Sequence, residues 1–404
     1  MLLSFPRPVV AVLWAGLLAA AGTALAQSAP PLRQALDAAW ALSPQARALA
    51  SRQAAFEARG RATASLLSGP PSVSLAHRSD RAGSNGGLRE LEAELSAPVW
   101  NPGVRSATRG ELDAERLAFD RKLALAKLGL AAEVRDLAAQ SALARNERDV
   151  AARKHEEAGA LAADVGRRVR AGELARVDLL QAQALQQQAA SVQAQASSAM
   201  TRLQARWLAL TGLPAVAELE EATATATAGE HPALAAAQAE LRAAQARLAL
   251  AEADRRDPVE VGVGLARERA AYGAASETSL RLALRVPLGS EGRNAPRLAA
   301  ARAEVDAAEA DADAAQRTVL AGQQAARSAL EAAQRSEVLA AERERLSREV
   351  QALIAKAYQL GESDLPTRLR ADSERFDAEL AHARARVEAR HALSTLNQAL
   401  GSLP

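Results

Sequence analysis

Three glutamates at alternate positions are the residues in this sequence best placed to do chemistry. Glu90, Glu92 and Glu94 alternate with apolar residues, which would place their carboxylates on one face of a β-strand. A later alternating segment carries Arg281 and Arg285, which could partly neutralise those carboxylates. The pattern predicts either a cation-tolerant wall of an aqueous passage or ordinary solvated polar residues that line a wide aqueous passage, and we favour the second.

The sequence offers no residues arranged for catalysis or for holding a cofactor. The five histidines show no metal-ligand spacing, and His155-Glu156-Glu157 lacks the second histidine of a zinc-binding helix. The chain contains no cysteine, and Gly262 and Gly264 lack the third glycine of a dinucleotide-binding loop. We therefore expect a protein that is not an enzyme, with no metal site and no cofactor.

The composition predicts long helices that pack closely, rather than an aromatic-rich globular core. About a quarter of the 404 residues are alanine, whereas the aromatic residues are only four Trp, four Phe and two Tyr. The 50 basic and 48 acidic residues nearly cancel to a formal charge of +2. This balance does not favour nucleic acid as a partner.

The first 26 residues have the pattern of a cleaved export signal. A positive Arg7 precedes the apolar stretch 9–21, and Ala24-Leu25-Ala26 has the small-x-small pattern of a cleavage site. Without a cysteine the exported chain cannot be lipidated. No later segment resembles a membrane-spanning helix, so membrane contact must come from strands or amphipathic surfaces.

The rest of the chain contains a tandem duplication. Pro98 and Gly103 recur 189 residues later as Pro287 and Gly292. Other landmarks recur at the same or nearly the same offset: Gly172-Glu173 with Gly361-Glu362, Gly212 with Gly401, and Ser43-Pro44 with His231-Pro232. Shared landmarks at one spacing predict two repeats, 27–212 and 231–404, joined by a linker over 213–230.

Each repeat reads as a helix, two strands, a very long helix, a turn and a return helix. The expected helices cover 31–68, 104–171 and 175–211 in the first repeat, and 232–257, 293–360 and 365–400 in the second. Each long helix has 68 positions, or about 100 Å at ~1.5 Å per residue. Near the end of the second, apolar residues step four and three positions apart as in a coiled-coil seam: Leu346, Val350, Leu353, Ala357 and Leu360.

The segments between the helices predict two amphipathic β-hairpins. Strands are expected at about 72–79, 88–99, 258–266 and 277–287, with one apolar and one polar face. Their length fits a transmembrane β-barrel, and a soluble sheet packed on the helices is the alternative. Because the smallest membrane barrels need about eight strands and open edges cannot lie in lipid, spanning strands would require several copies of the chain.

These features together resemble the TolC-like outer-membrane factor family, the outer membrane efflux proteins. The resemblance covers the mature chain and includes the helix-tip pattern Gly-x-x-x-x-x-Asp-x-Leu-x-Ala, which begins at Gly172 and has its aspartate at Asp178. The second tip departs from it, because Thr367 stands at the aspartate position. The compact chain is most similar to the heavy-metal and cation efflux branch.

The resemblance implies a mainly α fold with a small β part. Duplicated long-helix hairpins would form an α-barrel, and four strands per chain would contribute to a 12-stranded β-barrel of a homotrimer in outer-membrane lipid. The implied function is a passive exit channel of the outer membrane. It would receive substrates from an inner-membrane pump of the RND type through a periplasmic adaptor, with no nucleic acid involved.

The resemblance also implies roles for three sets of residues. The adaptor-docking helix tips would be Gly172, Glu173, Leu174, Asp178, Gly361, Glu362 and Ser363. The corners between barrel and helices would be Pro98, Gly103, Pro287 and Gly292. The lumen would be lined by Glu90, Glu92, Glu94, Arg281 and Arg285.

Two other classes of protein stay open from the sequence. A periplasmic adaptor is also exported and helical, but it has a single helical hairpin within split β-domains. A secreted coiled-coil structural protein would not need the amphipathic strands.

Overall fold

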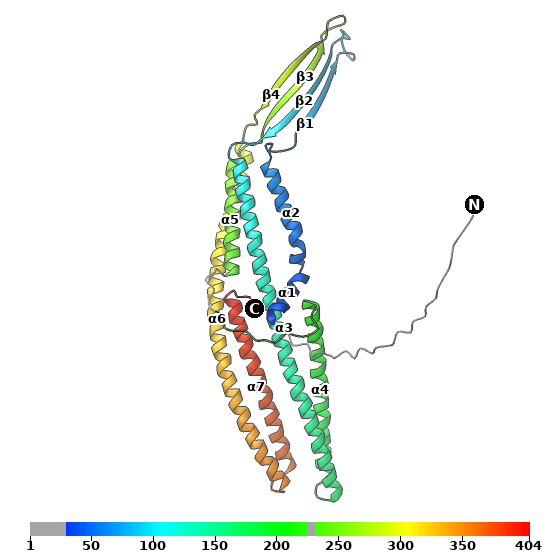
Figure 1. Ribbon diagram of the computed structural model, residues 1–404, viewed down its shortest axis with the longest axis vertical. Helices are drawn as coiled ribbons and strands as arrows, with labels where there is room; N and C mark the ends of the chain where they lie inside the picture. The colour runs from blue at the N-terminus through cyan, green and yellow to red at the C-terminus, as the bar shows by residue number, and fades with distance from the viewer. Residues whose placement is uncertain (1–29, 225–230) are drawn as a thin grey trace, which may run out of the picture.

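The computed structural model describes residues 30–224 and 231–404 as an elongated, mainly helical chain with one small sheet at its end (Figure 1). The expected export signal, 1–26, lies outside the described residues, as does the end of the linker, 225–230. The fold class predicted from the sequence is confirmed. In chain order the elements are α1 (Leu32–Leu42), α2 (Pro44–Ala64), β1 (Ser72–Ser79), β2 (Arg89–Val99), α3 (Val104–Ala171), α4 (Arg176–Thr211), α5 (Pro232–Ala253), β3 (Val259–Arg269), β4 (Glu277–Arg285), α6 (Glu291–Gln359) and α7 (Leu365–Ala399).

Two very long helices set the dimensions of the chain. With 68 and 69 residues, α3 and α6 each extend about 100 Å, from the sheet to the opposite end of the molecule. Shorter helices lie beside them: α2 and α4 along α3, and α5 and α7 along α6 (Figure 1). Because α3 also packs on α5 and α7, the two halves of the chain form one body. No helix of the described residues is long and apolar enough to cross a membrane.

The single helix expected over 31–68 is wrong, because the chain breaks at Ser43. Proline disfavours helical geometry in the residue before it, and Ser43 is extended (φ −66°, ψ 144°) ahead of Pro44. The Ser43 hydroxyl accepts a hydrogen bond from the Ala46 N–H and so caps α2. His231 and Pro232 start α5 in the same way, since the imidazole accepts from the Ala233 N–H. The recurring X-Pro pair thus marks a helix start in both halves.

Alanine makes close helix packing possible along the body. Ala131, Ala243 and Ala378 are fully buried, and methyl side chains let neighbouring helices approach one another closely. The largest fully buried side chain is Trp207, near the middle of the body, where its indole N–H donates to the Ala215 carbonyl at 2.9 Å. Small residues therefore provide most of the core, and aromatic side chains contribute only at single places such as Trp207.

A buried arginine ties the middle of the body together. Arg135 of α3 is only 2% exposed and donates through Nε and Nη2 to both carboxylate oxygens of Glu221, at 3.0 and 2.7 Å. It also donates to the side-chain oxygen of Gln398 and to the carbonyl of Ser402. One guanidinium thus joins α3, the linker and the end of α7. We call this group the Arg135 clamp.

The coiled-coil seam predicted near the end of α6 lies exposed in the single chain. Leu346 and Val350 are each 48% exposed, and Leu353 and Leu360 are each 65% exposed. Leu339 extends the same seven-residue spacing and is 71% exposed. Tyr358, which packs inward, belongs to a different face of this helix. These side chains do not pack within the chain, and we call Leu339, Leu346, Val350, Leu353 and Leu360 the α6 stripe.

Replacing Arg135 by Ala should destabilise the fold by about 3–5 kcal/mol, because the buried Glu221 carboxylate would lose its charged partner. The measurement is chemical unfolding in detergent. Arg135→Met with Glu221→Met should recover much of the loss, since no buried charge then lacks a partner. Lys127→Ala serves as the control, because Lys127 is on the same helix as Arg135 and its pair with Asp37 of α1 is exposed; stability should be nearly unchanged. Equal effects of Arg135→Ala and Lys127→Ala would contradict this account of the clamp.

Candidate functional site

The sheet keeps its strands in a register that separates apolar from polar residues. The order is β1-β2-β3-β4, each pair antiparallel, and residues directly opposite one another share a face. One rung runs from Leu75 through Ala93 and Leu265 to Leu280. Since every strand alternates in phase with its neighbours, the whole sheet has one apolar and one polar face.

The apolar face is not covered by any other part of the described chain. Figure 1 shows the sheet extending beyond the ends of the helices, so no helix packs on it. Its large residues are between 44% and 76% exposed: Val73, Leu75, Leu91, Leu95, Val261, Val263, Leu265, Leu280, Leu282 and Leu284. The alternative of a soluble sheet packed on the helices is therefore wrong. A continuous exposed apolar surface of this kind is typical of a site of contact with lipid or protein.

The polar face carries the five residues predicted to line a lumen. Glu90, Glu92 and Glu94 share it with Arg281 and Arg285, and the structure pairs charges across the strands. Arg281 Nη2 lies 2.8 Å from Glu92 Oε1, and Arg285 Nη1 lies 3.5 Å from Glu260 Oε2. The partial neutralisation expected from the sequence thus has a geometric basis, and the lumen role stays a prediction.

Two glycines of β3 make room for this charge network. Gly262 and Gly264 lie between β2 and β4 on the polar face, and a Cβ at Gly262 would meet the Glu94 carboxylate at 2.5 Å. Without side chains in the way, Arg281 reaches across β3 to Glu92 on β2. In the sequence, Gly262 and Gly264 alternate with valines on the polar face of a predicted strand and form an incomplete nucleotide-binding motif. Two glycines at alternate positions of a strand are a signal that a neighbouring side chain lies close to the backbone there.

The four corner residues hold different positions in the two halves. Gly103 precedes α3 with a left-handed φ of 82°, whereas Gly292 lies in the first turn of α6 without a positive φ. Pro98 is still within β2, and Pro287 follows the end of β4. The corners are therefore equivalent in sequence but not in backbone conformation.

The two helix tips end in the same backbone motif. Gly172 and Gly361 both have φ near 81°, a conformation that glycine adopts without steric cost. After Gly172 the Glu173 N–H donates to the Arg168 carbonyl at 2.9 Å, and the Glu362 N–H makes the same bond to the Ala357 carbonyl. This six-to-one bond closes the helix end in each half. Both tips lie at the end of the body opposite the sheet (Figure 1).

The return helices are capped by one carboxylate each, taken from different positions. In the first half Asp178, in the first turn of α4, accepts from the Ala175 N–H at 3.1 Å. In the second half Asp364, just before α7, accepts from the Thr367 N–H at 3.0 Å. These are the two reciprocal bonds of a capping box, one in each tip. The second tip is therefore capped, although Thr367 stands where the family pattern has an aspartate.

An apolar cluster joins the two tips into one unit. Val165, Tyr358 and Leu365 are almost fully buried there, and Leu174 packs against them. The Arg168 guanidinium lies 5.2 Å from the centre of the Tyr358 ring, and burial raises the pKa of the Tyr358 hydroxyl. Tyr358 was not singled out from the sequence, although it is one of only two tyrosines. Around this cluster Gly172, Glu173, Gly361 and Glu362 are exposed.

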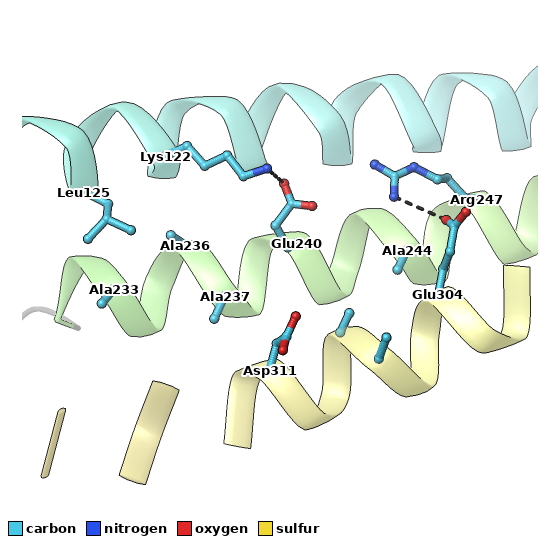
Figure 2. Close-up of a pocket in the computed structure, with 12 residues that line it drawn as sticks. Lys122, Leu125, Ala233, Ala236, Ala237, Glu240, Ala244, Arg247, Glu304 and Asp311 are labelled. Carbon is cyan, nitrogen blue, oxygen red and sulfur yellow. Dashed lines mark hydrogen bonds and ion pairs between the residues drawn. The ribbon is translucent and has the colours of Figure 1, made fainter. Parts of the chain in front are cut away.

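A groove of about 650 Å³ runs between α3, α5 and α6 on the sheet side of the body (Figure 2). Alanines form much of its lining, and four of its five charged side chains are paired, whereas Asp311 forms no ion pair with the described residues. Lys122 pairs with Glu240, and Arg247 Nη1 lies 3.5 Å from Glu304 Oε2 (Figure 2). Because these charges satisfy one another, the groove is better explained as a solvated seam between helices than as a ligand site.

The second half of the chain matches a known family by sequence. Residues 225–402 match the family described as outer membrane efflux protein. A comparison with curated protein sequences gave no match.

The whole chain matches solved structures of membrane channels by fold. A membrane protein from Pseudomonas aeruginosa superposes with a TM-score of 0.75 at 19% identity, over 92% of this chain and 93% of that one. VceC, an outer membrane protein of Vibrio cholerae, gives 0.72 at 16% identity over 92% and 96%. The open state of the MtrE outer membrane channel of Neisseria gonorrhoeae gives 0.71 at 18% identity over 92% and 89%. At these identities the likeness establishes the fold.

The Asp364 cap should make the second tip sensitive to acid. Its hydrogen bonds to Thr367 hold the pKa of the Asp364 carboxyl below its usual range. The stabilisation is therefore fully present above the unfolded value of about 3.9, and it is lost as pH falls through the lowered folded pKa. Hydrogen–deuterium exchange, corrected for intrinsic rates, should show the start of α7 losing protection over that range. Asp364→Asn keeps the acceptor oxygen but does not titrate, so its protection should stay constant. An identical acid response in both proteins would exclude this carboxylate as the cause.

Proposed function

The second half of this chain belongs to the outer membrane efflux protein family and the whole chain has the fold of the TolC-like channels; from this premise we propose that it is an outer-membrane exit channel. Three copies would close a barrel of strands in the outer membrane and continue as a helical tube into the periplasm. The channel would conduct substrates passively from an inner-membrane pump of the RND type through a periplasmic adaptor. It would carry out no chemistry on them.

The exposed apolar face of a sheet with two open edges carries the proposal. The outer edges of β1 and β4 have no partner strand in the described chain. Unpaired backbone N–H and C=O groups cost several kcal/mol each in hydrocarbon, so an apolar face can meet lipid only if these edges are closed. Pairing β1 of one copy with β4 of the next satisfies them, and three copies of four strands exceed the minimum of about eight. The polar face then lines the water-filled passage.

The α6 stripe supports the same assembly for the helices. In a single chain α6 packs on α5 and α7 through one side only, and its leucines at 339, 346, 353 and 360 remain exposed on the other. On the opposite border of the chain, α4 exposes Val177, Leu180 and Val192. We infer that the α6 stripe of one copy packs on α4 of the next, which would close the tube.

The exposed helix tips are the surfaces that we assign to the adaptor. Both turns lie at the end of the body opposite the sheet, which would be the periplasmic end. The glycines at 172 and 361, together with Glu173, Glu362 and Ser363, would form grooves between neighbouring tips. The family resemblance supports this role, and the two matching caps supply the regular shape that a docked hairpin needs.

Leu346→Asp with Leu353→Asp should weaken the trimer, because each leucine contributes about 1.5–3 kcal/mol when it is buried. The measurement is the temperature at which the detergent-extracted oligomer dissociates, which should fall clearly below that of the wild type. Ala352→Asp adds a charge at an exposed position off the stripe and should leave that temperature almost unchanged. An unchanged dissociation temperature for the Leu346→Asp, Leu353→Asp variant would rule out this interface.

Glu173→Lys with Glu362→Lys should reduce export by roughly tenfold while the oligomer stays intact, because both exposed carboxylates lie where the adaptor would dock. The measurement is substrate export in cells that depend on this chain and its own pump. Glu309→Lys, an exposed reversal on the shaft of α6, is the matched control and should export normally. Equal export by the tip variant, the control and the wild type would argue against docking at the tips.

A further inference from the structure

The apolar face of the sheet ends in three arginines and a histidine beside the hairpin loops. Arg89 and Arg269 lie directly opposite one another on β2 and β3, and Arg267 lies opposite Leu91 one rung closer to the apolar residues. His77 on β1 is opposite Leu91 on the other side. We call these four residues, His77, Arg89, Arg267 and Arg269, the rim cluster.

The rim cluster has no negative side chain on its own face. Like charges directly opposite one another destabilise a sheet, yet Arg89 and Arg267 form no ion pair or side-chain hydrogen bond with the described residues. Arg269 lies over the Tyr272 ring at 5.7 Å and donates only to the Gly87 carbonyl. On the polar face, by contrast, Arg281 and Arg285 each have a glutamate partner. No group of the described chain compensates the repulsion between these arginines, which indicates that an anion from outside the chain binds here.

A hollow of about 260 Å³ opens at this cluster. It is lined by His77, Arg89, Leu91, Arg267, Arg269 and Ser276. Glu90 and Glu268 complete the lining, but the strand register assigns their side chains to the polar face. Charged and apolar groups therefore meet in one depression.

The position of the cluster along the strands fits the border of a membrane. From Leu91 to Val99 the apolar face extends about 26 Å along β2 at ~3.3 Å per residue, or roughly 20 Å in height at the ~40° tilt of barrel strands. The rim cluster lies just beyond this band, at the level of lipid headgroups. The other end of the same face, at Val99 and Val259, carries no charged residue within the four strands.

We propose that the rim cluster binds the anionic phosphate groups of a net negatively charged lipid headgroup in the outer leaflet, while the apolar face below it contacts the acyl chains. This inference rests on the proposed placement of the strands in the outer membrane. Guanidinium groups form charge-assisted, bidentate hydrogen bonds with phosphate oxygens, and basic pockets at a membrane surface select anionic headgroups. Continuity with the apolar face favours a lipid over a free anion, since one molecule would occupy both surfaces.

Native mass spectrometry of the detergent-purified oligomer, titrated with diphosphorylated lipid A or with zwitterionic phosphatidylethanolamine, tests the proposal. The wild type should retain lipid A in preference to phosphatidylethanolamine. Arg89→Gln with Arg267→Gln should weaken lipid A binding about tenfold, because two charged donors to phosphate are lost. Arg78→Gln is the matched control, since Arg78 neighbours His77 but lies on the polar face, and it should bind as the wild type does.

Four results would overturn the inference. The double variant could bind lipid A as tightly as the wild type, or inorganic phosphate at an equal concentration could displace the lipid, which would make this a site for free anions. An oligomer recovered from the membrane without any preference for lipid A would overturn the inference alone. A wild-type chain that is never recovered as an oligomer from membranes would overturn the proposed function, and the lipid site with it.

Discussion

The backbone of an open sheet edge must find hydrogen-bond partners, and the rest of this structure depends on that requirement. Four strands share an apolar face that no part of the described chain covers, and β1 and β4 are open at the edges. In lipid, only closure with further copies satisfies those edges. In the proposed assembly the exposed stripe along α6 has the same cause, because a helix at the border of one copy would be interior. A single chain would then form one segment of the channel wall.

In the proposed channel, the long helices would extend this wall away from the membrane. Alanine at the contacts lets α3 and α6 pack closely with their neighbours, so the core needs few aromatic residues. Where the shorter helices end, at the middle of the body, the Arg135 clamp fastens the linker and the end of α7 to α3. At the tips, two matching turns present exposed carboxylates on a buried apolar base.

Features with a period or a repeated spacing could be predicted from the sequence, whereas features that depend on a distant partner could not. The duplication and the alternation in the strands gave the fold class, the faces of the sheet and both tip glycines. Nothing near Arg135 in the sequence indicates Glu221 as its partner, 86 positions away. The break at Ser43 was predictable, because its Ser-Pro pair matches the His-Pro pair that starts α5. The seam on α6 was recognised by its spacing, but spacing alone does not say which molecule covers it.

The mass of the complex extracted by detergent from the outer-membrane fraction, measured before and after heating, tests the central claim most directly. The account predicts a complex of three chains that dissociates to single chains on heating, recovered with the membrane. A single chain recovered from the soluble periplasmic fraction would contradict it, because the open strand edges and the α6 stripe would then be stable in water without a second copy.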